Sequence, residues 1–152
     1  EVIGPYLGVR RYRTKANNTQ ILAGEPAIVG NSNYAIAMVD GKPVVGTDSF
    51  LGIAQVDDTR TASLDGRVSI VTPIPNHTIL RGKAKSAAAI DTDAELLALL
   101  FTFVLFDLTS SSYTIDTGAA ANANGLRIEG GDIVRGTVDV TVDARAMRNV
   151  VA

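Results

Sequence analysis

The 152-residue chain contains no cysteine, no tryptophan and a single histidine, His77. Without cysteine the chain cannot form a disulfide, use a thiolate nucleophile or bind a metal through sulfur. One histidine leaves only oxygen ligands for a metal, which excludes histidine-based zinc sites. Catalysis by His77 would need a nucleophile or carboxylate partner that no local motif supplies, so we interpret it as a loop residue. These absences predict a protein that is not an enzyme and that holds no cofactor and no metal.

Long apolar runs and an excess of one charge are absent as well. The most apolar stretch, Leu96–Leu108, is interrupted by Thr102 and Asp107 and is shorter than the ~20 residues of a membrane span. The formal net charge of −2 does not favour binding to nucleic acid. We therefore expect neither a membrane nor nucleic acid as a partner.

The residues that are abundant favour strands. Valine, isoleucine and threonine number 16, 12 and 14, together 42 of the 152 residues, and glycine adds 14. This density of β-branched residues with frequent glycine is typical of a sheet protein. The length suits one domain, and no repeat or linker divides the chain. The expected fold is mainly β: a single small β-sandwich or β-barrel-like domain with one short helix and an extended N-terminal arm.

Turn signals and alternating patterns locate the strands. Asp40-Gly41 between the apolar segments 34–39 and 42–45 predicts a hairpin with a type I′ turn. Further strands are expected at 50–56, 67–72, 79–85 and 113–116, and a last hairpin at 126–128 with 133–142. In that hairpin the valines at 138, 140 and 142 are expected to point inward, and Thr137, Asp139 and Thr141 outward.

One helix is signalled, followed by the most apolar strand. Thr92-Asp-Ala-Glu95 matches a capping box, and the leucines after it predict a short helix that is buried on most sides. Residues 101–108 then alternate, which is typical of a central strand. With Phe103 in the core, Phe103→Ala is expected to cost ~3–5 kcal/mol. Asp91 and Asp93 are explained by the capping box, and Asp57-Asp58 by a turn, without a calcium site or a catalytic pair.

Positive charge is concentrated in the first 18 residues. Arg10, Arg11, Arg13 and Lys15 against Glu1 give this segment +3, while the rest of the chain carries −5. We divide the chain into a basic arm at 1–18 and a β-rich domain at 19–152. Extended, the arm places Arg11, Arg13 and Lys15 on one side.

The arm has three possible structures. It lies on an acidic partner surface, it is a solvated terminus, or it is a first strand of the body. For either kind of arm, deletion of residues 1–15 is expected to leave a folded domain. An unfolded product would indicate a first strand.

Three segments resemble a known family. They are Gly24-Glu-Pro-Ala-Ile-Val29, Phe50-Leu-Gly-Ile-Ala54 and Leu64-Asp-Gly-Arg-Val-Ser-Ile70. They are similar to the head decoration, or cement, proteins of tailed bacteriophages, which often show a Gly-x-Pro offset, a Gly-Ile-Ala strand and an Asp-Gly-x-Val strand. The resemblance covers about residues 20–85 and, with fewer matches, 91–142. Residues Leu96–Leu108 and the basic arm lie outside the shared pattern.

The resemblance implies a virion structural protein made in the host cytoplasm. It would bind the outer face of the capsid lattice and stabilise it, with the major capsid protein and copies of itself as partners. A homotrimer is the first expectation and a dimer the alternative. Capsid or intersubunit contacts would then involve Arg10, Arg11, Arg13 and Lys15. The alternatives are another virion component, such as a head-fibre base or capsid-protein domain, or a β-sandwich that binds a carbohydrate or other ligand.

Overall fold

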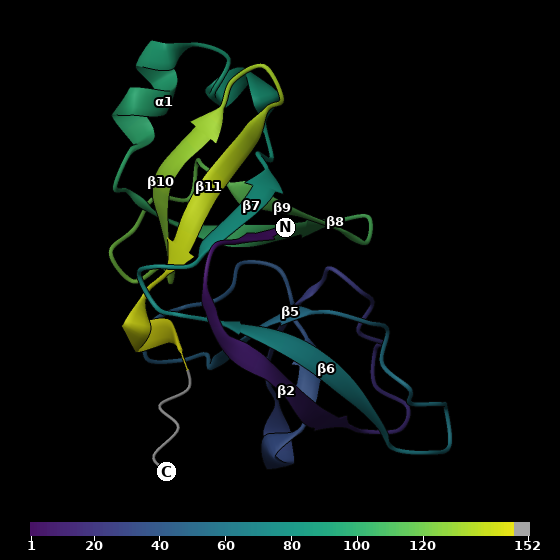
Figure 1. The fold of residues 1–152 in the computed structure, drawn as a ribbon. Helices are drawn as coiled ribbons and strands as arrows, with labels where there is room; N and C mark the ends of the chain where they lie inside the picture. Colours follow the sequence, from purple (N-terminus) through teal and green to yellow (C-terminus); the bar gives the residue numbers. More distant parts are fainter. Residues whose placement is uncertain (148–152) are drawn as a thin grey trace.

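The computed structural model describes residues 1–147, with Asn31 described without its side chain. The protein is mainly β, with two antiparallel sheets and one short helix, which confirms the small β-sandwich-like fold. The six-stranded sheet and the helix occupy the upper half of Figure 1, and the five-stranded sheet the lower half. Within the described residues, no helix has the length and apolar character to cross a membrane. The tail beyond 147 lies outside the described residues.

The six-stranded sheet closes on itself. Its strands, in spatial order, are β1 (Val2–Ile3), β7 (Ile79–Lys83), β11 (Thr137–Val142), β10 (Leu126–Asp132), β8 (Phe103–Thr109) and β9 (Ser112–Asp116). The segment after β7 reaches the far edge, where Ala84 bridges Ile115 and the Lys85 N–H donates to the Ile115 carbonyl at 2.9 Å. The outer edge of β9 is therefore paired with the chain's own backbone, as in a barrel.

The five-stranded sheet has two outer strands, β2 (Tyr6–Thr14) and β4 (Ala35–Ala37), which lie close together without pairing. Its strands, in order, are β2, β6 (Gly66–Pro73), β5 (Phe50–Ala54), β3 (Pro26–Val29) and β4. Strand β5 is buried along its whole length because apolar residues cover both of its faces. The strands expected at 50–56 and 67–72 are confirmed as β5 and β6, and Val68 and Ile70 face the core.

Two apolar clusters form the core, and the main one joins the sheets. The main core lies between them and contains residues of both, among them Phe50 of β5 and Phe106 of β8, whose rings stack with centroids 6.2 Å apart. The small core lies inside the five-stranded sheet and uses smaller side chains: Ile21, Ala27, Ala35, Leu51, Ala54, Val68 and Ile70. Each half of the molecule therefore depends on the other for burial of its apolar surface.

The segment after β4 crosses between the sheets, and the hairpin expected at Asp40-Gly41 is wrong. A type I′ turn needs positive φ at both central residues, but only Gly41 has it. The segment at Gly41 and Lys42 forms backbone hydrogen bonds with β8 instead of folding back on β4. The Gly41 N–H donates to the Phe106 carbonyl at 3.0 Å, and the Phe106 N–H donates to the Lys42 carbonyl at 2.8 Å.

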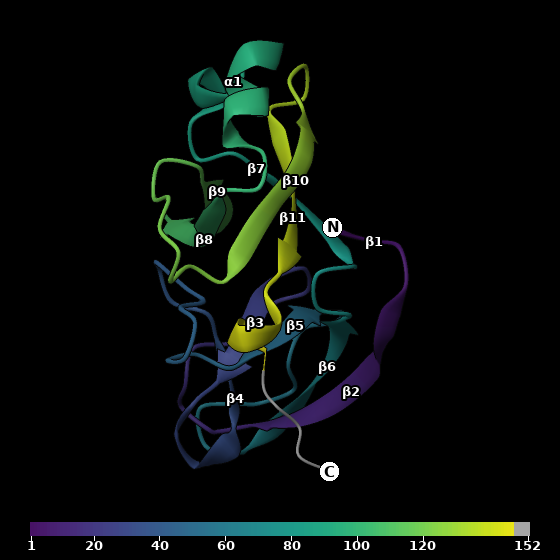
Figure 2. The same cartoon turned by 90° about the vertical axis from the view of Figure 1, so that its left-hand side faces the viewer.

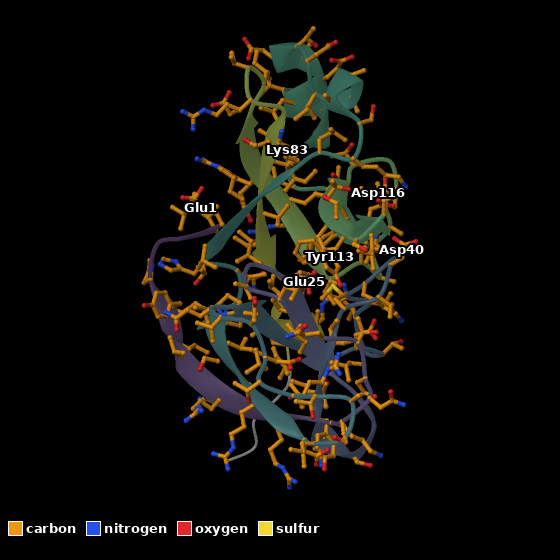
Figure 3. All side chains as sticks on the ribbon, turned by 90° about the vertical axis from the view of Figure 1, so that its right-hand side faces the viewer. Glu1, Glu25, Asp40, Lys83, Tyr113 and Asp116 are labelled. Carbon is orange, nitrogen blue, oxygen red and sulfur yellow. The ribbon has the colours of Figure 1, made fainter. Side chains whose placement is uncertain are left out.

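Two side chains reinforce this crossing. The Tyr113 hydroxyl donates to the Met38 carbonyl, and the Asp40 carboxylate accepts the Leu108 N–H at 3.0 Å. Figure 3 shows Tyr113 and Asp40 where the two halves meet.

The helix forms where predicted but is not buried. Helix α1 (Asp93–Leu99) begins at the Thr92 cap with both bonds of the capping box, which confirms the box. None of its residues is buried, and Leu97 is 66% exposed. The expectation of a largely buried helix is wrong because the helix lies on the outside of the six-stranded sheet. Only one side of the helix contacts the protein, where Leu99 packs against the main core.

The apolar run after the helix is a strand of the sheet, with the opposite face inward from the one predicted. Phe101 has φ +64° and is exposed, so the chain turns before β8 begins at Phe103. Val104 and Phe106 are buried, whereas Phe103 and Leu105 are only half-buried. The large cost expected for Phe103→Ala therefore belongs to Phe106.

The remaining strands follow the sequence pattern, with two differences. Segments 79–85 and 113–116 are confirmed as strands. The last hairpin forms, but its turn lies at 133–136 rather than 129–132, because β10 extends to Asp132 and β11 begins at Thr137. The three inward valines of β11 are fully buried. Thr141, expected to face outward, is buried, and its hydroxyl donates to the Glu129 carboxylate at 2.8 Å. Thr141 lies on the face opposite to the three valines, and a polar partner on β10 satisfies its hydroxyl where the residue is buried.

The N-terminal segment is extended but is not a free arm. Strand β1 pairs with β7 and β2 pairs with β6, so one continuous segment forms an edge of both sheets. Figure 2 shows it running down one side of the molecule. Tyr12 packs against the small core and Thr14 is buried. Of the three alternatives, the structure supports the first strand, and the folded body expected after deletion of residues 1–15 would lose one edge of its small core.

Candidate interaction surface on strand β2

The polar residues considered for chemistry have structural partners in the fold. Asp57 and Asp58 accept the backbone N–H groups of Ala23 and Ile21, at 2.8 and 2.9 Å. His77 is exposed in a turn, and its backbone N–H donates to the Ile74 carbonyl at 3.1 Å. Among residues 1–147, no three histidine, aspartate or glutamate side chains are grouped so that they could hold a metal.

Lys85 is the centre of the densest charge cluster. Its ammonium group lies 2.8 Å from Asp107 and 3.0 Å from Asp116. The hydrogen bond from Lys85 is the first cause that holds the pKa of Asp107 below its usual range. Hydrogen bonds to both carboxylates raise the pKa of Lys85, so its ammonium form is stabilised rather than a neutral nucleophilic amine. The cluster joins β9 to the segment after β7, which is a structural role.

Strand β2 carries three exposed apolar side chains next to several positive charges. Tyr6, Leu7 and Val9 are 48%, 58% and 44% exposed, and the arginines that follow them on the strand are exposed as well. We call this surface the β2 edge, defined as Tyr6, Leu7, Val9, Arg10, Arg11 and Arg13. A sheet edge with exposed apolar side chains is a common place for association with another chain.

The register with β6 decides which side chains share a face. Residues directly opposite in an antiparallel pair lie on the same face. Tyr12 is opposite buried Val68, and this side of the strand faces the small core. Arg11 is opposite Ser69 and Arg13 is opposite Arg67, so these arginines lie on the outer face. Arg11, Arg13 and Arg67 are three cations on this face, and Asp65 beside Arg13 neutralises only one of them, so a local positive potential remains.

The backbone of β2 is also available at this edge. The carbonyls of Ser69 and Arg67 accept N–H groups from Gln55 and Thr59, on the side of β6 away from β2. Ser69 and Arg67 are therefore the non-hydrogen-bonded partners of Arg11 and Arg13, and the amide groups of such pairs point away from each other. The N–H and C=O groups of Arg11 and Arg13, and by alternation those of Val9, point to the open side of β2.

The arginines differ in their partners. Arg13 lies 3.4 Å from Asp65 and 5.3 Å above the centre of the Tyr34 ring. The pKa of Asp65 is lowered first by the hydrogen bond from the Ala16 N–H, and further by Tyr34 and by the charges of Arg13 and Lys15. Within residues 1–147, Arg10 and Arg11 form no ion pair.

The four predicted contact residues do not form one row. Arg11 and Arg13 share the outer face as expected, and Arg10 lies on the other face. Lys15 follows the end of β2 and lines a cavity of about 400 Å³ with residues around β4. Because the strand ends at Thr14, the register does not assign Lys15 to a face, and its alignment with the two arginines stays a prediction.

Sequence reasoning missed Arg67 and the apolar half of this surface. Arg67 lies on the face of β6 opposite to the buried Val68, and only the pairing of β2 with β6 brings it beside Arg13. Tyr6, Leu7 and Val9 are exposed because β2 is the last strand of its sheet and carries a bulge at Gly8, which has φ +145°. A bulge beside an edge is visible only in the register.

No protein-family model and no curated protein matches the chain. The three segments with the decoration-protein pattern become the neighbouring strands β3, β5 and β6, and β2 pairs with the last of them. Their glycines have a physical reason in this fold. A Cβ at Gly52 would lie 2.0 Å from the Val71 carbonyl oxygen, and one at Gly66 would lie 2.1 Å from the Arg60 nitrogen.

Proposed function

We propose that the protein is a virion structural protein that binds the outer surface of a phage capsid lattice and stabilises it. The observation that carries the proposal is the β2 edge, where exposed apolar side chains and unpaired arginines lie together on a rigid sheet. The resemblance in β3, β5 and β6 supports it, because those strands form the sheet that presents this edge.

The surface suits a partner whose contact region is acidic and partly apolar. Arg11, Arg13 and Arg67 supply the positive charge, and Leu7 and Val9 supply the apolar contact. Each exposed charge contact contributes only ~0.2–1 kcal/mol, but a symmetric shell repeats the contact in every copy. The major capsid protein is the proposed partner, with further contacts between copies of this protein in a homotrimer or dimer.

Co-sedimentation with undecorated capsids tests the proposal. Arg11→Glu reverses one unpaired charge of the β2 edge, and we expect about a fivefold loss of binding per copy for ~1 kcal/mol. Arg135→Glu makes the same charge change in the turn between β10 and β11, and we expect wild-type binding. Binding by wild type and by Arg135→Glu should fall as salt rises. Absence of binding by wild type at low salt would overturn the function, and equal binding by both variants would overturn the assigned surface.

A further inference from the structure

We infer that the β2 edge accepts an extended acidic segment of the partner as an additional strand of the five-stranded sheet. The inference rests on the proposed function for the identity of the partner, whereas the free backbone groups of the edge follow from the register of β2 with β6. In this arrangement the partner's backbone pairs with β2, and its side chains meet the arginines and apolar residues on the two faces.

The backbone carries the first part of the argument. Val9, Arg11 and Arg13 direct their amide groups to the open side of β2, and no described strand pairs with β2 there. Alternate residues of a partner strand would find donors and acceptors at the spacing of a sheet. β9, the corresponding outer edge of the other sheet, already has its partner in the chain at Ala84 and Lys85.

The side chains select the chemistry of the added strand. Arg11 has no ion pair in the described residues, and Arg13 lies opposite Arg67 across the β2–β6 register. A carboxylate on the added strand would lie directly beside these cations, which stabilises cross-strand pairs of opposite charge. A second copy of β2 in the same place would bring its own arginines to this basic surface, so an acidic segment of another protein is the better occupant.

The length of the open edge fits one short strand. The bulge at Leu7 and Gly8 interrupts pairing at one end, and at the other end the strand stops at Thr14, just beyond the contact of the Arg13 guanidinium with the Tyr34 ring. A strand that occupies the edge would lie mainly along residues from Val9 to Arg13. Five residues match the common length of strands in globular proteins.

The test uses the full chain and a synthetic eight-residue peptide of alternating glutamate and threonine. Amide hydrogen exchange by nuclear magnetic resonance should show new protection at Val9 and Arg11 when the peptide is added. Arg10 and Tyr12, whose amides point to β6, should keep their exchange rates and serve as internal controls. Protection on both sets, or on neither, would overturn strand addition.

Two variants separate the backbone from the side chain. Val9→Pro removes the outward N–H while leaving the bonds to β6, and Val9→Ala removes most of the side chain but keeps the N–H. We expect Val9→Pro to bind the peptide about fivefold more weakly than Val9→Ala, as for the loss of one hydrogen bond. Arg11→Glu, which keeps every backbone group, should also weaken binding. Equal binding by the proline and alanine variants would overturn the inference, and the cross-peak pattern of the amides reports that each variant is folded.

The two proposals fail differently. If wild type binds capsids but the peptide leaves Val9 and Arg11 unprotected, strand addition is wrong and the proposed function stands. If the peptide protects these amides but capsids are not bound, the edge accepts an acidic strand and the proposed function is wrong. Protection that rises with protein concentration without peptide would assign the edge to a second copy and overturn the acidic partner.

Discussion

The two sheets of this protein treat their outer edges in opposite ways. The six-stranded sheet covers β9 with the segment after β7 and fixes that segment with Lys85 between Asp107 and Asp116. The five-stranded sheet leaves the outer side of β2 without a partner strand and places apolar and cationic side chains along it. Because an open edge promotes association, proteins usually cover it or shorten it. The covered edge therefore serves folding, and the open edge is available to a partner.

The largest loss of stability is expected from a substitution that removes the contact between the two sheets. Phe106 is buried and stacks on Phe50, so Phe106→Ala should cost ~3–5 kcal/mol. Phe103 on the same strand is half-buried, and Phe103→Ala should cost less than ~2 kcal/mol. Denaturant unfolding of the two variants measures the difference. A loss for Phe103→Ala as large as that for Phe106→Ala would mean that the other face of β8 is inward.

This pair of residues shows how far sequence reasoning reaches. Alternation in 101–108 predicts a strand correctly because period two is a local property of the chain. It does not decide which face is inward when both faces are apolar, as they are here. That choice depends on Phe50, which is distant in sequence and meets Phe106 only after the sheets pack.

The candidate surface was predictable to a similar extent. The concentration of arginine in the first 18 residues identifies the segment, since charge is read directly from the sequence. The choice between an arm and a strand was not predictable, because β2 pairs with β6 across more than fifty residues and pairing of that range has no local signal. Apolar exposure at Leu7 and Val9 depends on the same pairing.

A smaller effect is expected at the crossing between the sheets. Tyr113→Phe removes the hydroxyl that bonds the Met38 carbonyl, which should cost ~0.5–1.5 kcal/mol. Burial, together with the charge of Glu25, raises the pKa of Tyr113 to about 12. The pKa in the folded protein lies above the unfolded value of about 10. The contribution of the Tyr113 hydroxyl to the free energy of unfolding is therefore present below pH ~10 and is lost as pH rises through ~12.

Thermal unfolding between neutral and strongly alkaline pH checks both parts of this prediction. The difference in stability between wild type and Tyr113→Phe should shrink as pH rises from ~10 to ~12. Absorbance titration of the four tyrosines should show one late ionisation in wild type that is absent from the variant. If all tyrosines of wild type titrate together near pH ~10, Tyr113 is not enclosed between the sheets.

The smallest effect compares one carboxylate from each edge. Asp107 is buried and forms an ion pair with Lys85 at the closed edge, whereas Asp65 is exposed and lies beside Arg13 at the open edge. The pKa of each is lowered, so each stabilises the fold above the unfolded value of ~3.9, and this contribution is lost as pH falls through the folded value. Asp107→Asn should therefore lower the melting temperature at neutral pH and flatten its fall in acid, with little dependence on salt.

Asp65→Asn should change the melting temperature less, and added salt should remove part of its effect because solvent and ions screen exposed charges. Melting temperatures of wild type and both variants from neutral pH to about pH 2, at low and high salt, provide the comparison. Equal losses for the two variants would mean that the charges around β2 are needed for folding as much as those around β9. A smaller, salt-sensitive loss at Asp65 would mean that Arg11, Arg13 and Arg67 contribute little to folding. Their charges would then be free to bind a partner strand in place of solvent.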